Sequence, residues 1–339
     1  MAVDLKTQYL GLTLKNPLAV AACQPLTGDM EMLGKLEAAG ASCVVMPSLF
    51  EEQVVHEELE ISNLYDFHTD SNPEALTNLP PFPEYDKGSD EYLKRLEEAK
   101  KTLSIPVIGS LNGSSKGGWV RYAKEMQDAG ADALELNIYF IPTDVNMTGD
   151  QVEGQYVDLV AAVRESVSIP LAVKIGQNFT SLPNFAQKLV GAGANGLVLF
   201  NRYLEADINL DELEFYPDLV LSNRHEARVP IRWISILRDQ VSASLAATSG
   251  IHRMEGAIKL LLAGADVLML ASVLLMKGPN QLTTILNDMT AWLEQKEYVS
   301  VQQLQGSMSC ANSSNPSELV RANYMKALRN YTTEYTSPH

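Results

Sequence analysis

The chain has 339 residues, 46% of them hydrophobic and 20% charged, and its formal net charge is −16. This composition is typical of a globular protein with a large core, and the excess negative charge disfavours polyanionic partners such as nucleic acids. No apolar run approaches the roughly 20 residues that a membrane helix needs, and the N-terminus lacks the pattern of an export signal. We therefore expect no nucleic-acid partner, no membrane span and a cytoplasmic location.

The spacing of cysteine and histidine gives no sign of a disulfide framework or a metal site. Cys23, Cys43 and Cys310 lie far apart, without a CxxC pair, and the five histidines show no paired metal-ligand spacing. Disulfide frameworks and zinc or iron–sulfur sites in small modules use closely spaced ligands. We expect no bound metal, and any iron–sulfur centre would belong to a partner.

Short apolar runs predict eight β-strands. In chain order these strands lie within residues 18–22, 38–46, 104–111, 128–136, 168–175, 191–199, 242–250 and 262–270. Four of them share one repeated phrase, AAGASCVVM, DAGADALEL, GAGANGLVL and LAGADVLML, in which a helix stops at glycine and a strand begins. Two others, SIPVIGSL and SIPLAVKI, place proline at the strand entry, where its missing N–H is tolerated.

Amphipathic segments separate these strands, as at 90–103, where leucine and alanine recur at helical spacing. Strands that alternate with helices pair in parallel, and strands without polar alternation are buried on both faces. Eight such units predict an α/β fold, a (β/α)8 TIM barrel, with an open doubly wound sheet as the alternative. The GxGxxG pattern at 191–196 lies between a helix and a strand, so it marks a turn rather than a dinucleotide site.

The predicted barrel spans residues 1–300, and a C-terminal helical extension occupies 301–339. The connection at about 47–88, after the second strand, is long for a compact domain. Loops of this length are usually lids or binding loops when they are ordered. We expect this loop to cover the substrate, with a simple surface excursion as the alternative.

Polar and small residues gather at the carboxyl ends of the predicted strands, where α/β barrels place their chemistry. These positions are Ala21, Ala22, Met46 to Ser48, Ser110, Asn137, Lys174, Asn201, Thr248, Ser249, Gly250, Ala271 and Ser272. A lysine inside a barrel is costly to desolvate, so Lys174 forms a structural ion pair or lies against an electron-rich ligand. Asn137 and Asn201 either tie down loop backbone or hydrogen-bond a planar heterocycle.

The last two strand ends predict a cofactor-phosphate site. Thr248, Ser249 and Gly250 lead into a helix, and Ala271 and Ser272 follow the eighth strand. Small residues let backbone amides approach an anion, and barrels frequently bind phosphate at these two loops. Two ordinary turns are the alternative.

The order of these residues resembles the dihydroorotate dehydrogenase family over about residues 10–296. KNPLAVAACQPLTG at 15–28 is similar to the family's Asn-Pro start, and ATSGI at 247–251 and LAS at 270–272 are similar to its two phosphate turns. The resemblance implies non-covalent FMN, with Ala21, Ala22 and Ser110 beside the flavin and Lys174 facing it. It places Asn137 and Asn201 near flavin and substrate, and we expect Asn78 in the long loop to join them as a substrate contact.

The chain departs from the family at the position of the catalytic base. The family motif Asn-x-Ser-Cys-Pro-Asn, or its serine version, carries the base, whereas this chain has NIYFIPT at 137–143, with Phe140 at that position. Tyr139 is the adjacent titratable side chain, and it either serves in proton transfer or packs over the flavin. Val45 to Pro47 replace a family lysine, and LSNRHE at 221–226 replaces a glycine-rich turn.

These features predict an FMN-dependent oxidoreductase that transfers hydride between flavin N5 and a small planar substrate, with Lys174 and Tyr139 as the catalytic candidates. One alternative is a genuine dihydroorotate dehydrogenase of pyrimidine biosynthesis, in which Tyr139 or a water replaces the base. Another is a non-catalytic flavin-binding subunit of an electron-transfer complex. Besides the small-molecule substrate, a second copy of the chain and an electron-transfer protein stay open as partners.

Overall fold

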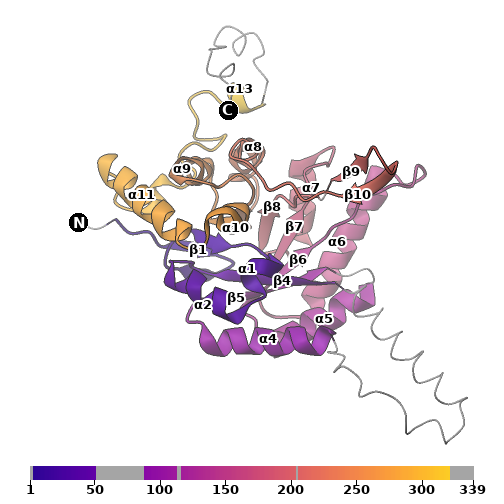
Figure 1. Cartoon of the computed structure of the whole chain (residues 1–339). Coiled ribbons are helices and arrows are strands. Elements are labelled where there is room, and N and C mark those ends of the chain that lie inside the picture. Colours follow the sequence, from indigo (N-terminus) through magenta and orange to yellow (C-terminus); the bar gives the residue numbers. More distant parts are fainter. Residues whose placement is uncertain (1–2, 51–87, 113–115, 204, 321–339) are drawn as a thin grey trace, which may run out of the picture.

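Eight parallel strands close into a barrel in the computed structural model, which describes residues 3–50, 88–112, 116–203 and 205–320. The strand order around the barrel is β11-β12-β3-β4-β5-β6-β7-β8. The strands are β3 (Leu18–Val20), β4 (Val44–Phe50), β5 (Val107–Asn112), β6 (Ala133–Asn137), β7 (Leu171–Ile175), β8 (Gly196–Leu199), β11 (Ser244–Ala247) and β12 (Val267–Leu270). The closed order confirms the predicted TIM barrel and excludes the open sheet (Figure 1).

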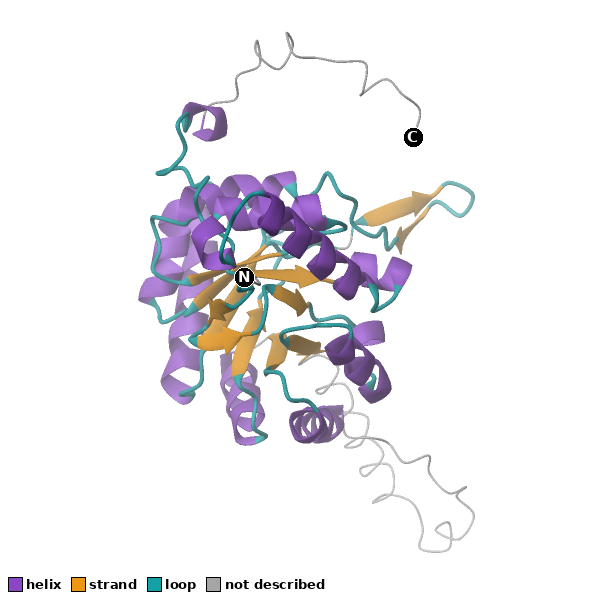
Figure 2. Ribbon diagram, turned by 90° about the vertical axis from the view of Figure 1, so that its left-hand side faces the viewer, coloured by secondary structure: helices purple, strands orange, loops and turns teal. Residues whose placement is uncertain are grey.

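Helices surround the strands, which lie at the centre of the molecule in Figure 2. Those described are α1 (Gln24–Thr27), α2 (Met30–Ala38), α4 (Gly88–Thr102), α5 (Lys116–Asp128), α6 (Gly149–Ser166), α7 (Leu182–Gly191), α8 (Arg228–Leu237), α9 (Met254–Ala263), α10 (Ser272–Lys277), α11 (Gln281–Gln295), α12 (Val301–Leu304) and α13 (Ser317–Val320). The helix predicted at 90–103 is α4. The GxGxxG segment is a turn after α7, where Gly193 has φ +108°.

Alternating strand residues divide the core into an inner and an outer layer. On β6, Leu134 and Leu136 pack outward against the helices, whereas Ala133 belongs to the inner cluster. The inner positions hold several small residues, namely Ala19, Ala133, Ala172 and Ala246. These alanines leave room in the barrel interior for larger polar side chains.

A hairpin of β1 (Thr7–Tyr9) and β2 (Leu12–Leu14) lies at the amino end of the barrel. Tyr9 and Leu14 are buried against the inner cluster. The backbone N–H of Leu10 donates to Ser244 Oγ at 3.1 Å, and Thr7 Oγ1 donates to the carbonyl of Asp266 at 2.8 Å. The hairpin therefore closes this end, and the cavity described below lies at the opposite, carboxyl end.

Strand β4 continues beyond the end that the sequence predicts. Residues 48–50 pair with β5 after a register shift between Val45 and Ser48, so strand β4 extends to Phe50 and the predicted lid loop does not begin at about residue 47. Residues 51–87, which include Asn78, lie outside the described residues. The expected role of that loop stays a prediction.

A second hairpin, β9 (Ala206–Asn209) and β10 (Glu214–Pro217), follows β8 and projects from the barrel in both ribbon views (Figures 1 and 2). This hairpin was not predicted from the sequence. Its strands are almost entirely exposed, so they lack the buried apolar run that identifies the barrel strands.

The first part of the predicted C-terminal extension packs on the barrel. Val301 and Leu304 are fully buried in the outer core. The backbone N–H of Gly306 donates to the carbonyl of Leu261 at 2.9 Å, and that of Cys310 to Ser235 at 2.8 Å. The boundary at residue 300 stays a prediction, as does the extension beyond residue 320. No helix within the described part of the chain has the length and apolarity needed to cross a membrane.

Candidate functional site

A cavity of about 990 Å³ opens at the carboxyl ends of the strands. Its volume lies at the upper end of the usual range for small-molecule sites, roughly 300–1,000 Å³. Most of the predicted site residues line it, namely Ala21, Ala22, Asn137, Lys174, Asn201, Thr248, Ser249, Gly250, Ala271 and Ser272. The structure thus brings together side chains as far apart in the sequence as Ala21 and Ser272, because parallel strands end at one edge.

Amide and hydroxyl side chains from four strand ends form one hydrogen-bonded chain. Asn201 Nδ2 donates to Asn137 Oδ1 at 2.6 Å, and Asn137 Nδ2 donates to Ser48 Oγ at 3.1 Å. Ser48 Oγ lies 2.8 Å from Ser110 Oγ. The two asparagines therefore orient each other instead of tying down loop backbone.

Ser110 lies behind Ser48, away from the cavity. Ser110 is fully buried and does not line the cavity, whereas Ser48 does. The hydroxyl of Tyr92 accepts from the Ser110 N–H at 3.0 Å. The sequence marked position 48 only as a strand end, because the register shift in β4 that turns Ser48 toward the site leaves no sequence signal.

Lys174 lies on the cavity wall near the end of β7. Its Nζ is 3.6 Å from Glu135 Oε1, and the side chain of Lys174 is 10% exposed. This separation makes an ion pair but exceeds hydrogen-bond length. Lys174 therefore forms the expected ion pair and also lines the cavity, whereas its contact with an electron-rich ligand stays a prediction.

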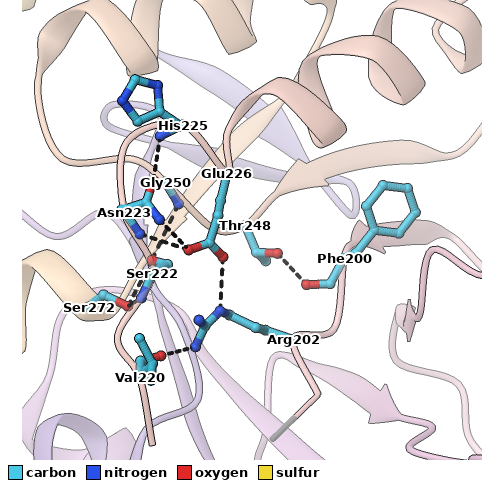
Figure 3. Close-up of polar contacts among 10 residues, drawn as sticks. All are labelled: Phe200, Arg202, Val220, Ser222, Asn223, His225, Glu226, Thr248, Gly250 and Ser272. Atoms are coloured by element: carbon cyan, nitrogen blue, oxygen red, sulfur yellow. Dashed lines mark hydrogen bonds and ion pairs between the residues drawn. The ribbon is translucent and has the colours of Figure 1, made fainter. Parts of the chain in front are cut away.

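Three segments meet at the predicted phosphate end of the cavity (Figure 3). Ser222 Oγ donates to Ser272 Oγ at 2.9 Å, and the Gly250 N–H donates to Ser222 Oγ at 3.4 Å. Ser249 and Gly250 have φ of +68° and +74°. A Cβ atom on Gly250 would lie 2.3 Å from the backbone nitrogen of Ala227. Glycine is thus required where these backbones approach each other.

The loop at 221–226 supplies Ser222, a cavity-lining residue that the sequence analysis missed. The Glu226 carboxylate stabilises this loop, because it accepts hydrogen bonds from Arg202 Nε at 2.9 Å and from the Asn223 N–H at 2.9 Å (Figure 3). Side-chain contacts thus hold the conformation at the position where the family has glycines.

His252 lines the cavity beside the same loop. Its Nε2 atom is buried without a hydrogen-bond partner in the described part of the chain. Burial lowers the pKa of His252, so the neutral imidazole is favoured. An unpaired buried ring nitrogen in a cavity wall is suited to a polar ligand group.

Tyr139 and Phe140 do not line the cavity. Tyr139 packs edge-on against Tyr203, with ring centroids 4.7 Å apart and planes at 80°. Tyr203 lines the cavity, and burial raises its pKa. The structure therefore favours aromatic packing for Tyr139, whose catalytic role stays a prediction, and it identifies Tyr203 as a cavity residue that the sequence did not reveal.

A closed α/β barrel with a lysine and an amide pair at one side of the cavity, and hydroxyl and glycine residues after its last two strands, defines an enzyme of the TIM-barrel class. The sequence model of the dihydroorotate dehydrogenase family matches residues 82–293, so the chain belongs to that family. Its members are flavoprotein oxidoreductases that act on CH–CH groups. The resemblance found in the sequence is confirmed.

Curated relatives of this family match most of the chain at low identity. The catalytic subunit of dihydroorotate dehydrogenase B (NAD(+)) from Thermoplasma acidophilum is 24% identical, covering 89% of this chain and 98% of the relative. The corresponding subunit from Methanocaldococcus jannaschii is 25% identical over 89% of this chain and 97% of the relative. Dihydroorotate dehydrogenase A (fumarate) from Lactobacillus delbrueckii subsp. bulgaricus is 26% identical over 80% of this chain and 87% of the relative.

Proposed function

We propose that this chain is an FMN-dependent oxidoreductase in which hydride passes between flavin N5 and a small planar substrate. The observation that carries the proposal is Lys174, a nearly buried ammonium on the wall of a large cavity whose lining is partly polar and partly apolar. Its nitrogen donates no hydrogen bond to any described residue, so its N–H groups are available to a ligand. The flavin, when bound, would supply the redox chemistry that protein side chains lack.

The phosphate end of the cavity fits an anionic group. Ser222 and Ser272 offer hydroxyls, Gly250 allows close backbone approach, and His252 offers an unpaired Nε2. Because the lowered pKa keeps His252 neutral near pH 7, its ring would contribute a hydrogen bond rather than a charge. These residues would hold the cofactor phosphate.

Asn137, Asn201 and Lys174 would orient the flavin ring and the substrate. The 2.6 Å hydrogen bond between the two asparagines fixes one amide against the other, and the lysine adds a positive charge in a partly desolvated wall. Preorganised donors of this kind stabilise charge that develops during reaction without reorganising. Ala21 and Ala22 are small enough to let the planar ring lie against β3.

The cavity favours a substrate other than dihydroorotate. Phe140, at the family's base position, has no titratable group and lies off the cavity wall. Tyr203 lies on the wall, but its raised pKa keeps the phenol protonated near neutral pH, which suits a proton donor better than a base.

Genuine dihydroorotate dehydrogenase activity stays the alternative. Anaerobic mixing with dihydroorotate tests it, because bleaching of the flavin absorbance would support it.

An electron-transfer protein is the proposed partner. Two of the relatives are named as catalytic subunits of an NAD(+)-linked enzyme, a name that implies further subunits. A non-catalytic flavin-binding subunit is the remaining alternative. Stable co-purification with a second protein, together with no turnover by the isolated chain, would favour it.

The test begins with the absorption spectrum of the purified protein and mass analysis of what it releases on denaturation. We expect a flavin spectrum and released FMN. Lys174→Met should retain less flavin or reduce it at least tenfold more slowly, whereas Lys188→Met, at an exposed lysine of α7, should behave as wild type. A colourless protein that takes up no added FMN would refute the proposal.

A further inference from the structure

Glu135 is a buried carboxylate that the family resemblance does not explain. It lies on β6 two residues before Asn137, so its side chain points into the barrel about one strand repeat below the cavity wall. Its side chain is 1% exposed, and neither carboxylate oxygen has a hydrogen-bond partner in the described part of the chain. An unbonded buried carboxylate is costly, so a compensating interaction is required.

Lys174 is the compensating charge. Glu135 Oε1 lies 3.6 Å from Lys174 Nζ. The groups whose pKa values the Glu135 charge raises are a thiol and two phenols, which carry no positive charge. Burial and the nearby Glu135 charge raise the pKa of the Cys43 thiol to about 12 and raise the pKa of the Tyr9 and Tyr92 hydroxyls. No other cation in the described residues lies within ion-pair distance of Glu135.

The ion pair is asymmetric with respect to the cavity. Lys174 lines the cavity, whereas Glu135 does not and is sealed among inner-layer residues. A ligand in the cavity would therefore contact the Lys174 ammonium directly, whereas the Glu135 carboxylate would act on the ligand only from behind Lys174. The carboxylate limits the freedom of a flexible lysine chain and offsets part of its positive charge.

Stability alone gives a weak reason for this pair. A buried ion pair returns little net stability compared with apolar residues of similar volume, and barrel interiors are dominated by branched apolar side chains. Ala172, a member of the apolar inner cluster, is the β7 register partner of Glu135. A role in setting the position and effective charge of Lys174 accounts for a carboxylate at this depth.

We infer that Glu135 is a positioning residue that holds the Lys174 ammonium at the cavity wall and sets how strongly it stabilises negative charge on the bound cofactor. This inference rests on the proposed FMN function. Reduced flavin carries more negative charge than oxidised flavin, so a nearby cation raises its reduction potential and a nearby anion lowers it. Removing the Glu135 charge should therefore raise the potential.

The experiment measures the midpoint potential of the FMN-bound protein against a reference dye. Glu135→Gln, which keeps the side-chain volume, should shift the ratio of reduced to oxidised flavin about tenfold toward the reduced form, equivalent to about 30 mV for a two-electron couple. Glu135→Asp keeps the negative charge but moves it farther from Lys174. It should therefore shift the ratio in the same direction by a smaller amount. Lys174→Met should shift it the opposite way.

Asp132→Asn is the matched control. Asp132 directly precedes β6 and pairs with Lys100 at 2.6 Å, but it does not line the cavity. We expect this change to alter the melting temperature without altering the potential. It therefore separates loss of an ion pair from loss of the Glu135 charge beneath Lys174.

The outcomes distinguish the two proposals. An FMN-bound Glu135→Gln protein with the wild-type potential would overturn the positioning role and leave the proposed function intact, even if its melting temperature falls. A wild-type protein that takes up no FMN would overturn both. If Glu135→Gln does not fold, the Glu135→Asp potential decides, and a value equal to wild type overturns the inference.

Discussion

Burial favours the neutral form of His252, so the free energy of unfolding should depend on pH through this residue. Because its pKa is lowered, the unfolded chain binds a proton near pH 6.5 that the folded chain takes up only at lower pH. The contribution of His252 is therefore complete above about pH 6.5 and is lost as the pH falls below that value. We expect melting of the FMN-free protein to depend less on pH between 5 and 7 in His252→Gln than in wild type.

His225→Gln is the control for this measurement, because His225 is an exposed histidine on the neighbouring loop. Its melting profile should follow that of wild type. An unchanged slope in His252→Gln would contradict the assignment of a neutral, buried imidazole to the cavity wall.

At the residue scale the sequence identified side chains that end barrel strands and missed those that loops bring in. Asn137, Lys174 and Asn201 were predictable because each follows an apolar run that fixes its position at one edge. Ser222 and Tyr203 lie in connections whose path depends on contacts such as Arg202 with Glu226. Those contacts have no periodic pattern in the sequence.

At the scale of elements, backbone geometry after β11 limits the residues that the phosphate loop accepts. Gly250→Ala should lower the free energy of unfolding by about 2 kcal/mol or more, because φ of +74° strains an alanine and its Cβ would meet the Ala227 backbone at 2.3 Å. The same change should reduce FMN retention. Urea unfolding and flavin content after gel filtration measure the two effects.

Gly154→Ala is a matched change in α6, where an added Cβ meets no atom within 4 Å. Replacing a helical glycine in open space should be neutral or stabilise by up to about 1 kcal/mol. A Gly250→Ala protein as stable as Gly154→Ala would show that the loop relaxes freely and that its glycine has no structural requirement.

The barrel elements were predictable because burial imposes a pattern on them. Each barrel strand is a short apolar run, and glycine marks the helix-to-strand junctions. The β9–β10 hairpin obeys neither rule, since Leu210, Leu213 and Phe215 are exposed in and beside its strands. Because these apolar residues are exposed, their pattern in the sequence does not indicate a buried strand, and the hairpin could not be predicted from it.

At the scale of the whole molecule, the core continues past the predicted end of the barrel. Val301 and Leu304 pack in the same hydrophobic cluster as the strands. Gln305 Nε2 donates to the carbonyl of Ala265 at 2.8 Å and lies 3.3 Å from Thr7 Oγ1. These contacts join the chain after residue 300 to both β1 and the α9–β12 turn, so α12 should unfold together with the barrel.

Leu304→Ala tests this continuity. Leu304 is fully buried, and removing such a side chain from a core costs about 2–5 kcal/mol. We expect that loss in urea unfolding, with far-UV circular dichroism and tryptophan fluorescence reporting one coincident transition. Gln302→Ala, on the exposed face of the same helix, should change the free energy of unfolding by no more than about 0.5 kcal/mol. If Leu304→Ala left the transition of the barrel unchanged, α12 would be a separate extension, and the boundary at residue 300 would be thermodynamically real.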